Sequence, residues 1–129
     1  MVPADLRYSE SHEWARLEGD LVTVGITRFA VDQLTDVTAI ELPKLGKEVV
    51  AGKDFGFIET VKAVSDLYAP VSGVVAEVNT AIPSDGLGPI ADDPFGAGWL
   101  VKIRVPAGTT LDAMKTPEQY EDQIAGGAH

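Results

Sequence analysis

The sequence is organised around one stretch, Phe57-Ile58-Glu59-Thr60-Val61-Lys62-Ala63-Val64-Ser65-Asp66-Leu67-Tyr68-Ala69-Pro70-Val71-Ser72-Gly73. β-Branched and aromatic residues crowd both of its flanks, which indicates two β-strands, over 55–60 and 64–69. The polar residues Glu59, Lys62 and Ser65 interrupt the apolar run where a hairpin would turn. The pattern therefore predicts a hairpin over about 55–70 with Lys62 at or near its tip. Spacing alone explains Lys62 equally well as an ordinary solvated turn lysine.

The composition predicts one small domain spanning residues 1–129. A chain of 129 residues buries roughly two thirds of its unfolded surface, which is enough for one modest core. Ten Lys and Arg against 20 Asp and Glu give a net charge of −10, which argues against a nucleic-acid partner and favours basic partner proteins. No apolar run reaches the length of a membrane helix, and the first five residues do not resemble a signal peptide. We therefore expect a cytoplasmic protein with no membrane partner.

The residues available for chemistry are few. Cysteine is absent, which excludes disulfides, thiolate nucleophiles and iron–sulfur ligation by this chain. His12 beside Glu13 is at most half a metal site, because His129 is the only other histidine and metal ligands must cluster. Asp92 and Asp93 are neighbours that point opposite ways in an extended chain, which favours a structural role. The sequence thus predicts no catalytic residues and no metal site, so redox chemistry must come from an attached group.

The central stretch resembles the lipoylation segment of the glycine cleavage system H protein, over Glu59 to Ala63 and again over 65–73. Gly46, 16 residues before Lys62, and Gly73, 11 residues after it, fit the wider pattern of lipoyl and biotinyl domains. This resemblance implies a mainly β barrel-sandwich hybrid, in which two antiparallel sheets fold over one core. It also implies a short helix near residue 30 and a C-terminal helix.

The same resemblance implies the site residues. Lys62 would carry lipoic acid as a covalent lipoyl-lysine amide, and Glu59 and Ala63 would take part in recognition by the lipoylating enzyme. The tract 11–14, Ser-His-Glu-Trp, resembles family residues that shelter the loaded arm. The implied arm cleft is lined by Ser11, Glu13, Gln33 and Asp66. The alternatives are a cap on the first strand for the tract 11–14, and solvated strand-edge carboxylates for Glu59 and Asp66.

A carrier protein, rather than an enzyme, is the function that the resemblance implies. The lipoyl arm would take the aminomethyl group of glycine from the pyridoxal-phosphate-dependent glycine decarboxylase (P protein) to the tetrahydrofolate-dependent aminomethyltransferase (T protein). Dihydrolipoyl dehydrogenase (L protein) would reoxidise the arm, and a lipoate ligase or a lipoyl/octanoyl transferase would attach it. Such a carrier favours a rigid β scaffold with one protruding arm, and we expect a monomer.

Two other functions stay open at the sequence level. The chain departs from the family pattern at Arg28, Gln33 and Ala91, which is consistent with a divergent branch. It could therefore be an H-like lipoyl carrier of another pathway, such as sulfur oxidation. It could also be an unmodified interaction module in which Lys62 is only a turn residue. A biotin carrier is disfavoured, because biotinyl domains place Met on both sides of the lysine and this chain has Val61 and Ala63.

The flanking sequence completes the predicted sheets. A hairpin turns at Glu18-Gly19-Asp20, and a two-turn helix starts at an N-cap on Thr27. Residues 80–98 are dense in Gly and Pro, which predicts an irregular loop. Further strands are predicted over 37–42, 74–79 and 99–105, and a helix capped by Thr116 runs to about Ile124.

Overall fold

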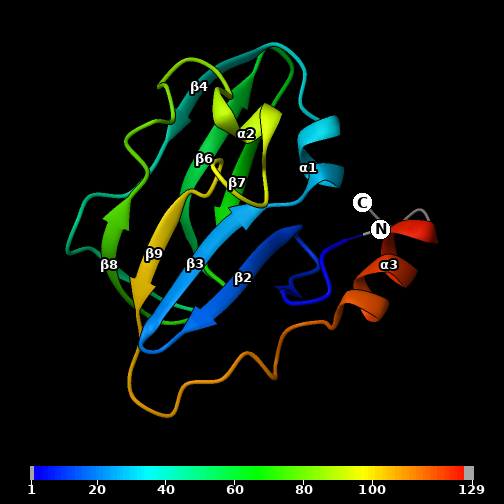
Figure 1. Ribbon diagram of the computed structural model, residues 1–129. Helices are drawn as coiled ribbons and strands as arrows, with labels where there is room; N and C mark the ends of the chain where they lie inside the picture. Colours follow the sequence, from blue (N-terminus) through cyan, green and yellow to red (C-terminus); the bar gives the residue numbers. More distant parts are fainter. Residues whose placement is uncertain (1, 127–129) are drawn as a thin grey trace.

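The computed structural model describes residues 2–126, which form nine strands and three helices (Figure 1). The strands are β1 Arg7–Tyr8, β2 Glu13–Glu18, β3 Leu21–Ile26, β4 Val37–Glu41, β5 Glu48–Val49, β6 Asp54–Thr60, β7 Val64–Tyr68, β8 Gly73–Val78 and β9 Val101–Arg104. The helices are α1 Arg28–Asp32, α2 Pro89–Asp92 and α3 Pro117–Ala125. No helix within residues 2–126 is long and apolar enough to cross a lipid bilayer.

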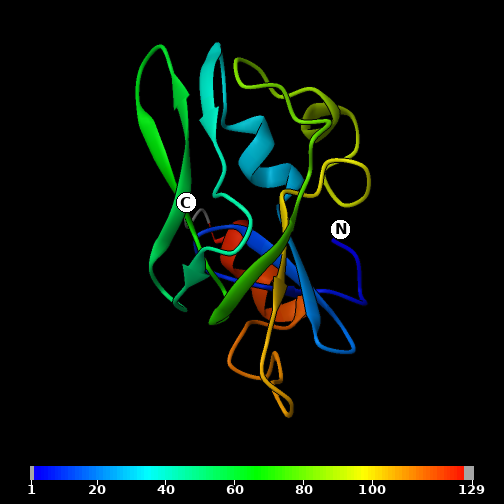
Figure 2. The ribbon, with the colours of Figure 1, turned by 90° about the vertical axis from the view of Figure 1, so that its left-hand side faces the viewer.

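The strands pair into two antiparallel sheets, as predicted for a barrel-sandwich hybrid. The larger sheet has the order β1-β2-β3-β9-β8-β5, and the smaller has the order β4-β6-β7. Figure 2 shows the sheets as two layers, with α1 between the upper parts of the layers. The main core lies between the layers, where apolar residues such as Val24, Ile58 and Ile103 are almost completely buried. The predicted fold class is therefore confirmed.

The hairpin β6–β7 follows the sequence pattern closely. Ile58 and Leu67 point into the core and are 1% and 3% exposed, whereas Glu59 and Asp66 are exposed. The alternation is the period of two expected for strands with one buried face. The strands end at Thr60 and begin again at Val64, so Lys62 lies at the tip as predicted.

Other elements differ from the sequence prediction. The helix after Thr27 has five residues, slightly less than one and a half turns rather than the predicted two, because the chain leaves it at Gln33 to reach the smaller sheet. The predicted irregular loop contains the short helix α2, which begins with a proline at its first turn. The last strand starts at Val101 rather than residue 99, and the two-residue strands β1 and β5 were not predicted. The helix capped by Thr116 is confirmed, with a complete capping box.

The two glycines of the lipoyl-domain pattern have different physical roles. Gly46 adopts a φ of +85°, in the left-handed region that glycine enters without strain. Gly73 begins β8 where its backbone runs against β9, and a Cβ there would overlap the carbonyl oxygen of Arg104. Gly73 is therefore required by close approach, and Gly46 by backbone conformation.

We predict that Gly73→Ala lowers the free energy of unfolding by about 2 kcal/mol or more, because the backbone of β9 cannot move away cheaply. Gly46→Ala should cost about 1 kcal/mol, since only the left-handed conformation opposes it. Gly86→Ala is the matched control, because its nearest neighbour would lie 4.0 Å away, and it should change stability by less than about 0.5 kcal/mol. Urea unfolding curves measure all three, and equal losses at Gly73 and Gly86 would contradict the close-approach argument.

Candidate functional site

The tip of the β6–β7 hairpin is held by one side chain. The hydroxyl oxygen of Thr60 accepts hydrogen bonds from the backbone N–H groups of Lys62, at 3.3 Å, and Ala63, at 3.2 Å. The N–H of Thr60 in turn donates to the carbonyl of Ala63 at 2.8 Å. Lys62 itself is exposed. The turn therefore fixes the backbone around Lys62 and leaves its side chain in solvent.

The surroundings of Lys62 leave its amine accessible. Val61 and Val64 on either side are 71% and 57% exposed, which is unusual for apolar residues of this size. Within residues 2–126 the ion pairs join Arg16 to Glu18 and Arg104 to Asp20, so neither involves Lys62. The amine is available for amidation, as the predicted lipoyl attachment requires.

Glu59 and Ala63, the two predicted recognition residues, both lie on the exposed surface of the hairpin. Glu59 is on β6, opposite Val64 of β7, and its carboxylate is 3.4 Å from the hydroxyl of Thr38 on β4. Ala63 lies in the tip turn beside Lys62. An enzyme that approached Lys62 would meet both residues.

A cavity of about 260 Å³ brings together the four residues predicted to form the arm cleft. Ser11 comes from the turn before β2, Glu13 is the first residue of β2, Gln33 is the C-cap of α1, and Asp66 lies on β7. The remaining walls are largely apolar, and are formed mainly by Ile26, Phe29, Ala30, Leu34, Ile58 and Leu67. The cavity is therefore an apolar space between α1 and the hairpin with carboxylates on its lining.

Glu13 is the most buried polar residue of this cavity, with 1% of its surface exposed. Its Oε1 accepts hydrogen bonds from the hydroxyls of Ser11 and of Ser9, the latter at 2.6 Å. Its Oε2 accepts from the backbone N–H of Tyr68 at 3.1 Å. Burial raises the pKa of Glu13 above its ordinary value, although these hydrogen bonds act to lower the pKa.

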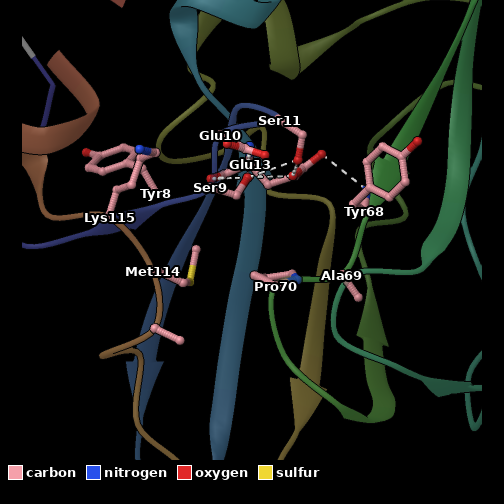
Figure 3. A pocket seen from close by; sticks show the side chains of 12 residues that line it. Tyr8, Ser9, Glu10, Ser11, Glu13, Tyr68, Ala69, Pro70, Met114 and Lys115 are labelled. Atoms are coloured by element: carbon pink, nitrogen blue, oxygen red, sulfur yellow. Dashed lines mark hydrogen bonds between the residues drawn. The ribbon is translucent and has the colours of Figure 1, made fainter. Parts of the chain in front are cut away.

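A second, larger cavity of about 570 Å³ also includes Ser11 and Glu13 in its lining (Figure 3). Figure 3 shows Glu13 between the two serines and Tyr68, with its hydrogen bonds dashed. Sequence analysis missed Ser9 and Tyr68 as partners of Glu13. Ser9 could have been suspected, because it lies four residues before Glu13, but the contact with Tyr68 uses a backbone N–H and leaves no sequence signal.

His12 and Asp93, which were considered for other chemistry, and Arg28, which departs from the family pattern, all have structural partners. The ring of His12 lies 4.9 Å from that of Phe29, and no group of three possible metal ligands occurs in the described part of the chain, which does not include His129. The carboxylate of Asp93 accepts a hydrogen bond from the backbone of Ala97 at 3.1 Å. Arg28 donates to the carbonyl of Ala91 at 2.7 Å, so two of the departures from the family pattern are in contact.

An exposed lysine at the tip of a hairpin, carried by two antiparallel sheets, defines the class of lipoyl-type carrier domains. The sequence model of the glycine cleavage H-protein matches residues 6–126. The chain is 53% identical over 126 residues to the glycine cleavage system H protein of Microcystis aeruginosa, covering 96% of this chain and 95% of that one. It is 51% identical over 123 residues to a probable H protein of Haloarcula marismortui, covering 95% and 96% of the two chains.

The fold comparison agrees with the sequence comparison. The crystal structure of a glycine cleavage system H protein from Mycobacterium marinum superposes with a TM-score of 0.84 at 39% identity, covering 96% of this chain and 99% of that one. The chain therefore belongs to the glycine cleavage H-protein family. Membership places it among the carrier components of the glycine cleavage system rather than among the enzymes.

We predict that the buried carboxyl group of Glu13 makes the fold less stable as the pH rises. Below its ordinary pKa of 4.5 both the folded and unfolded states are protonated, and above the raised folded-state pKa both are ionised. Between the two values only the unfolded state ionises, so the free energy of unfolding falls by about 1.4 kcal/mol per pH unit. Glu13→Gln removes this loss.

Urea unfolding of the parent and of Glu13→Gln at a series of pH values from about 4 upward measures the effect. The stability of the parent relative to the variant should fall as the pH rises above the ordinary pKa of 4.5. Glu77→Gln, which changes an exposed carboxylate on β8, is the control and should follow the parent. A parent-to-Glu13→Gln difference that does not change with pH would contradict the argument.

Proposed function

We propose that Lys62 carries lipoic acid as an amide and that the chain shuttles the aminomethyl group of glycine. The observation that supports this function best is the exposed amine of Lys62 on a turn whose backbone is fixed by Thr60. The bound lipoyl group would supply a dithiolane able to take up the aminomethyl unit and give it up again. The protein would supply attachment, positioning and shelter.

The partners follow from this shuttle. The pyridoxal-phosphate-dependent decarboxylase would load the carrier, the tetrahydrofolate-dependent aminomethyltransferase would unload it, and dihydrolipoyl dehydrogenase would restore the disulfide. A lipoate ligase or a lipoyl/octanoyl transferase would modify Lys62, with Glu59 and Ala63 in its contact surface. We propose that the carrier works as a monomer in the cytoplasm. The high identity to H proteins over nearly the whole chain favours this pathway over sulfur oxidation or an unmodified interaction module.

The cavity of about 260 Å³ is suited to sheltering the arm. Ser65, the first lining residue after Lys62, lies three residues on, so the lining of the cavity begins within about 10 Å of the attachment point along the chain. Phe29, Leu34 and Ile58 would contact the methylene chain of the arm. The exposed carboxylate of Asp66 would attract the amino end of the cargo, because opposite charges favour each other, and Glu13 would hold Ser11 in the cavity lining.

Intact mass is the direct test of attachment. The parent, co-expressed with an active lipoate ligase and supplied with lipoate, should gain the mass of one lipoyl amide, and Lys62→Arg should gain nothing. Lys53→Arg is the matched control, because Lys53 is exposed at the base of the same hairpin and should leave modification complete. An unmodified parent, with the ligase active on another lipoyl domain, would leave only the interaction module.

We also predict that Glu59→Gln slows lipoylation of Lys62 by about tenfold, the effect of losing one hydrogen bond to a charged group. Asp54→Asn removes the other exposed carboxylate of β6, but at the far end of the strand from Lys62, and should have no effect on the rate. The measurement is the initial rate of the mass shift at limiting ligase. Equal rates for the parent and Glu59→Gln would remove Glu59 from the recognition surface.

A further inference from the structure

Helix α3 packs at the side of the larger sheet, against β1. Strand β1 leads into the turn over residues 9–12, which contributes Ser11 and His12 to the cavity lining. Its residue Tyr120 is completely buried and stacks on Tyr8 of β1, with ring centroids 4.8 Å apart and an angle of 13° between the rings. Burial raises the pKa of both phenols, so both hydroxyls stay neutral. Neither tyrosine lines the smaller cavity.

The hydroxyl of Tyr120 lies at a junction of two segments that do line that cavity. It is hydrogen-bonded to Nδ1 of His12 at 2.8 Å and to Oγ1 of Thr27 at 2.7 Å. The N–H of Thr27 also donates to the carbonyl of His12 at 3.0 Å. Three hydrogen bonds thus join the helix, the turn before β2 and the start of α1 at one point.

Each of the two segments forms one wall of the cavity. His12 stands between Ser11 and Glu13, and it adopts a φ of +76°, a conformation that a residue other than glycine keeps only where its surroundings hold it. Thr27 is the N-cap of α1, and its hydroxyl accepts from the N–H of Ala30. Helix α1 and the two residues that follow it then supply the opposite wall, with Phe29, Ala30, Gln33 and Leu34.

A second contact from α3 holds the same turn. The side-chain amide of Gln123 donates to the backbone carbonyl of Glu10 at 2.9 Å. Gln123 follows Tyr120 by three residues, so both side chains project from one face of the helix. The turn that carries Ser9 and Ser11 to the carboxylate of Glu13 is therefore fastened to α3 at two places.

We propose that Tyr120 is a positioning residue whose hydroxyl sets the separation of the two cavity walls. The C-terminal helix thereby controls how well the loaded arm docks, although it touches neither Lys62 nor the cavity. This proposal rests on the proposed function, because it assumes that the cavity shelters the loaded arm. The proposed role belongs to the hydroxyl of Tyr120 and not to its ring. Removal of the hydroxyl alone leaves the ring stacked on Tyr8 but breaks the hydrogen bonds to His12 and Thr27.

The experiment compares Tyr120→Phe with Tyr8→Phe in the full, lipoylated chain. Tyr8→Phe is matched to it, because Tyr8 is the other ring of the stack and its buried hydroxyl donates to the carbonyl of Pro3 at 2.6 Å, away from the cavity. Docking is read from the backbone amide chemical shifts of Ser11, Glu13 and Gln33 in the unloaded and aminomethyl-loaded states. Thermal unfolding of each variant reports any general loss of stability.

In Tyr120→Phe the docking equilibrium constant should fall by about tenfold, whereas the rate of lipoylation of Lys62 should stay that of the parent. In Tyr8→Phe docking should stay within about twofold of the parent. Gln123→Ala should weaken docking in the same direction as Tyr120→Phe, and it decides the matter if Tyr120→Phe does not fold.

The positioning role would be overturned if Tyr120→Phe had the docking equilibrium constant of the parent, or if both tyrosine variants lost docking equally. Either result would leave the carrier function intact. A parent that is lipoylated and loaded but shows no shifts at the cavity residues would overturn the shelter itself, and the positioning role with it. A parent that is not lipoylated would overturn the proposed function. The three failures are therefore distinguishable.

Discussion

The buried carboxylate of Glu13 is the interaction on which the rest of the site depends. Glu13 is the first residue of β2 in the larger sheet, and it accepts the backbone N–H of Tyr68 at the end of β7 in the smaller sheet. A carboxylate in such a place is costly unless its oxygens are hydrogen-bonded. The turn before β2 must therefore present Ser9 and Ser11 to it, which fixes the left-handed backbone at the intervening His12.

This anchoring makes the base of the hairpin β6–β7 fixed and buried, whereas its tip is exposed. Its base is fixed by the hydrogen bond from Tyr68 to Glu13 and by the burial of Ile58 and Leu67. Beyond Thr60 the chain leaves the core, and within residues 2–126 the tip is held by its own local hydrogen bonds and by one from the N–H of Val61 to the carbonyl of Asp36. An anchored base with an exposed tip suits the proposed carrier role, in which Lys62 would enter a partner's active site while the scaffold stays folded.

The parts of this site that depend on local sequence were predictable, and those that depend on distant contacts were not. The strand period and the polar interruptions placed the hairpin and its tip lysine, and the Thr-Pro-x-Gln pattern placed the start of α3. The partner of Glu13 is a backbone amide 55 residues away, and the partner of His12 is a phenol 108 residues away, so neither leaves a pattern. The two-residue strand β5 forms because it pairs with β8, and two residues are too few to show a strand periodicity in the sequence.

The net charge of the chain would favour fast association with partners, and the tether of the proposed arm would allow fast release. A carrier that visits several partners in turn must find each quickly and must leave each quickly. A net charge of −10 favours fast association with basic surfaces, and the proposed amidation of Lys62 would remove one positive charge from the exposed hairpin tip. Tethering raises the concentration of the reactive group at the partner to about the millimolar range without a tight interface. Under the proposed function the cargo would need a shelter within reach of the same tether between visits, and the cavity whose lining begins on β7, the strand that leaves the tip, is placed to serve as one.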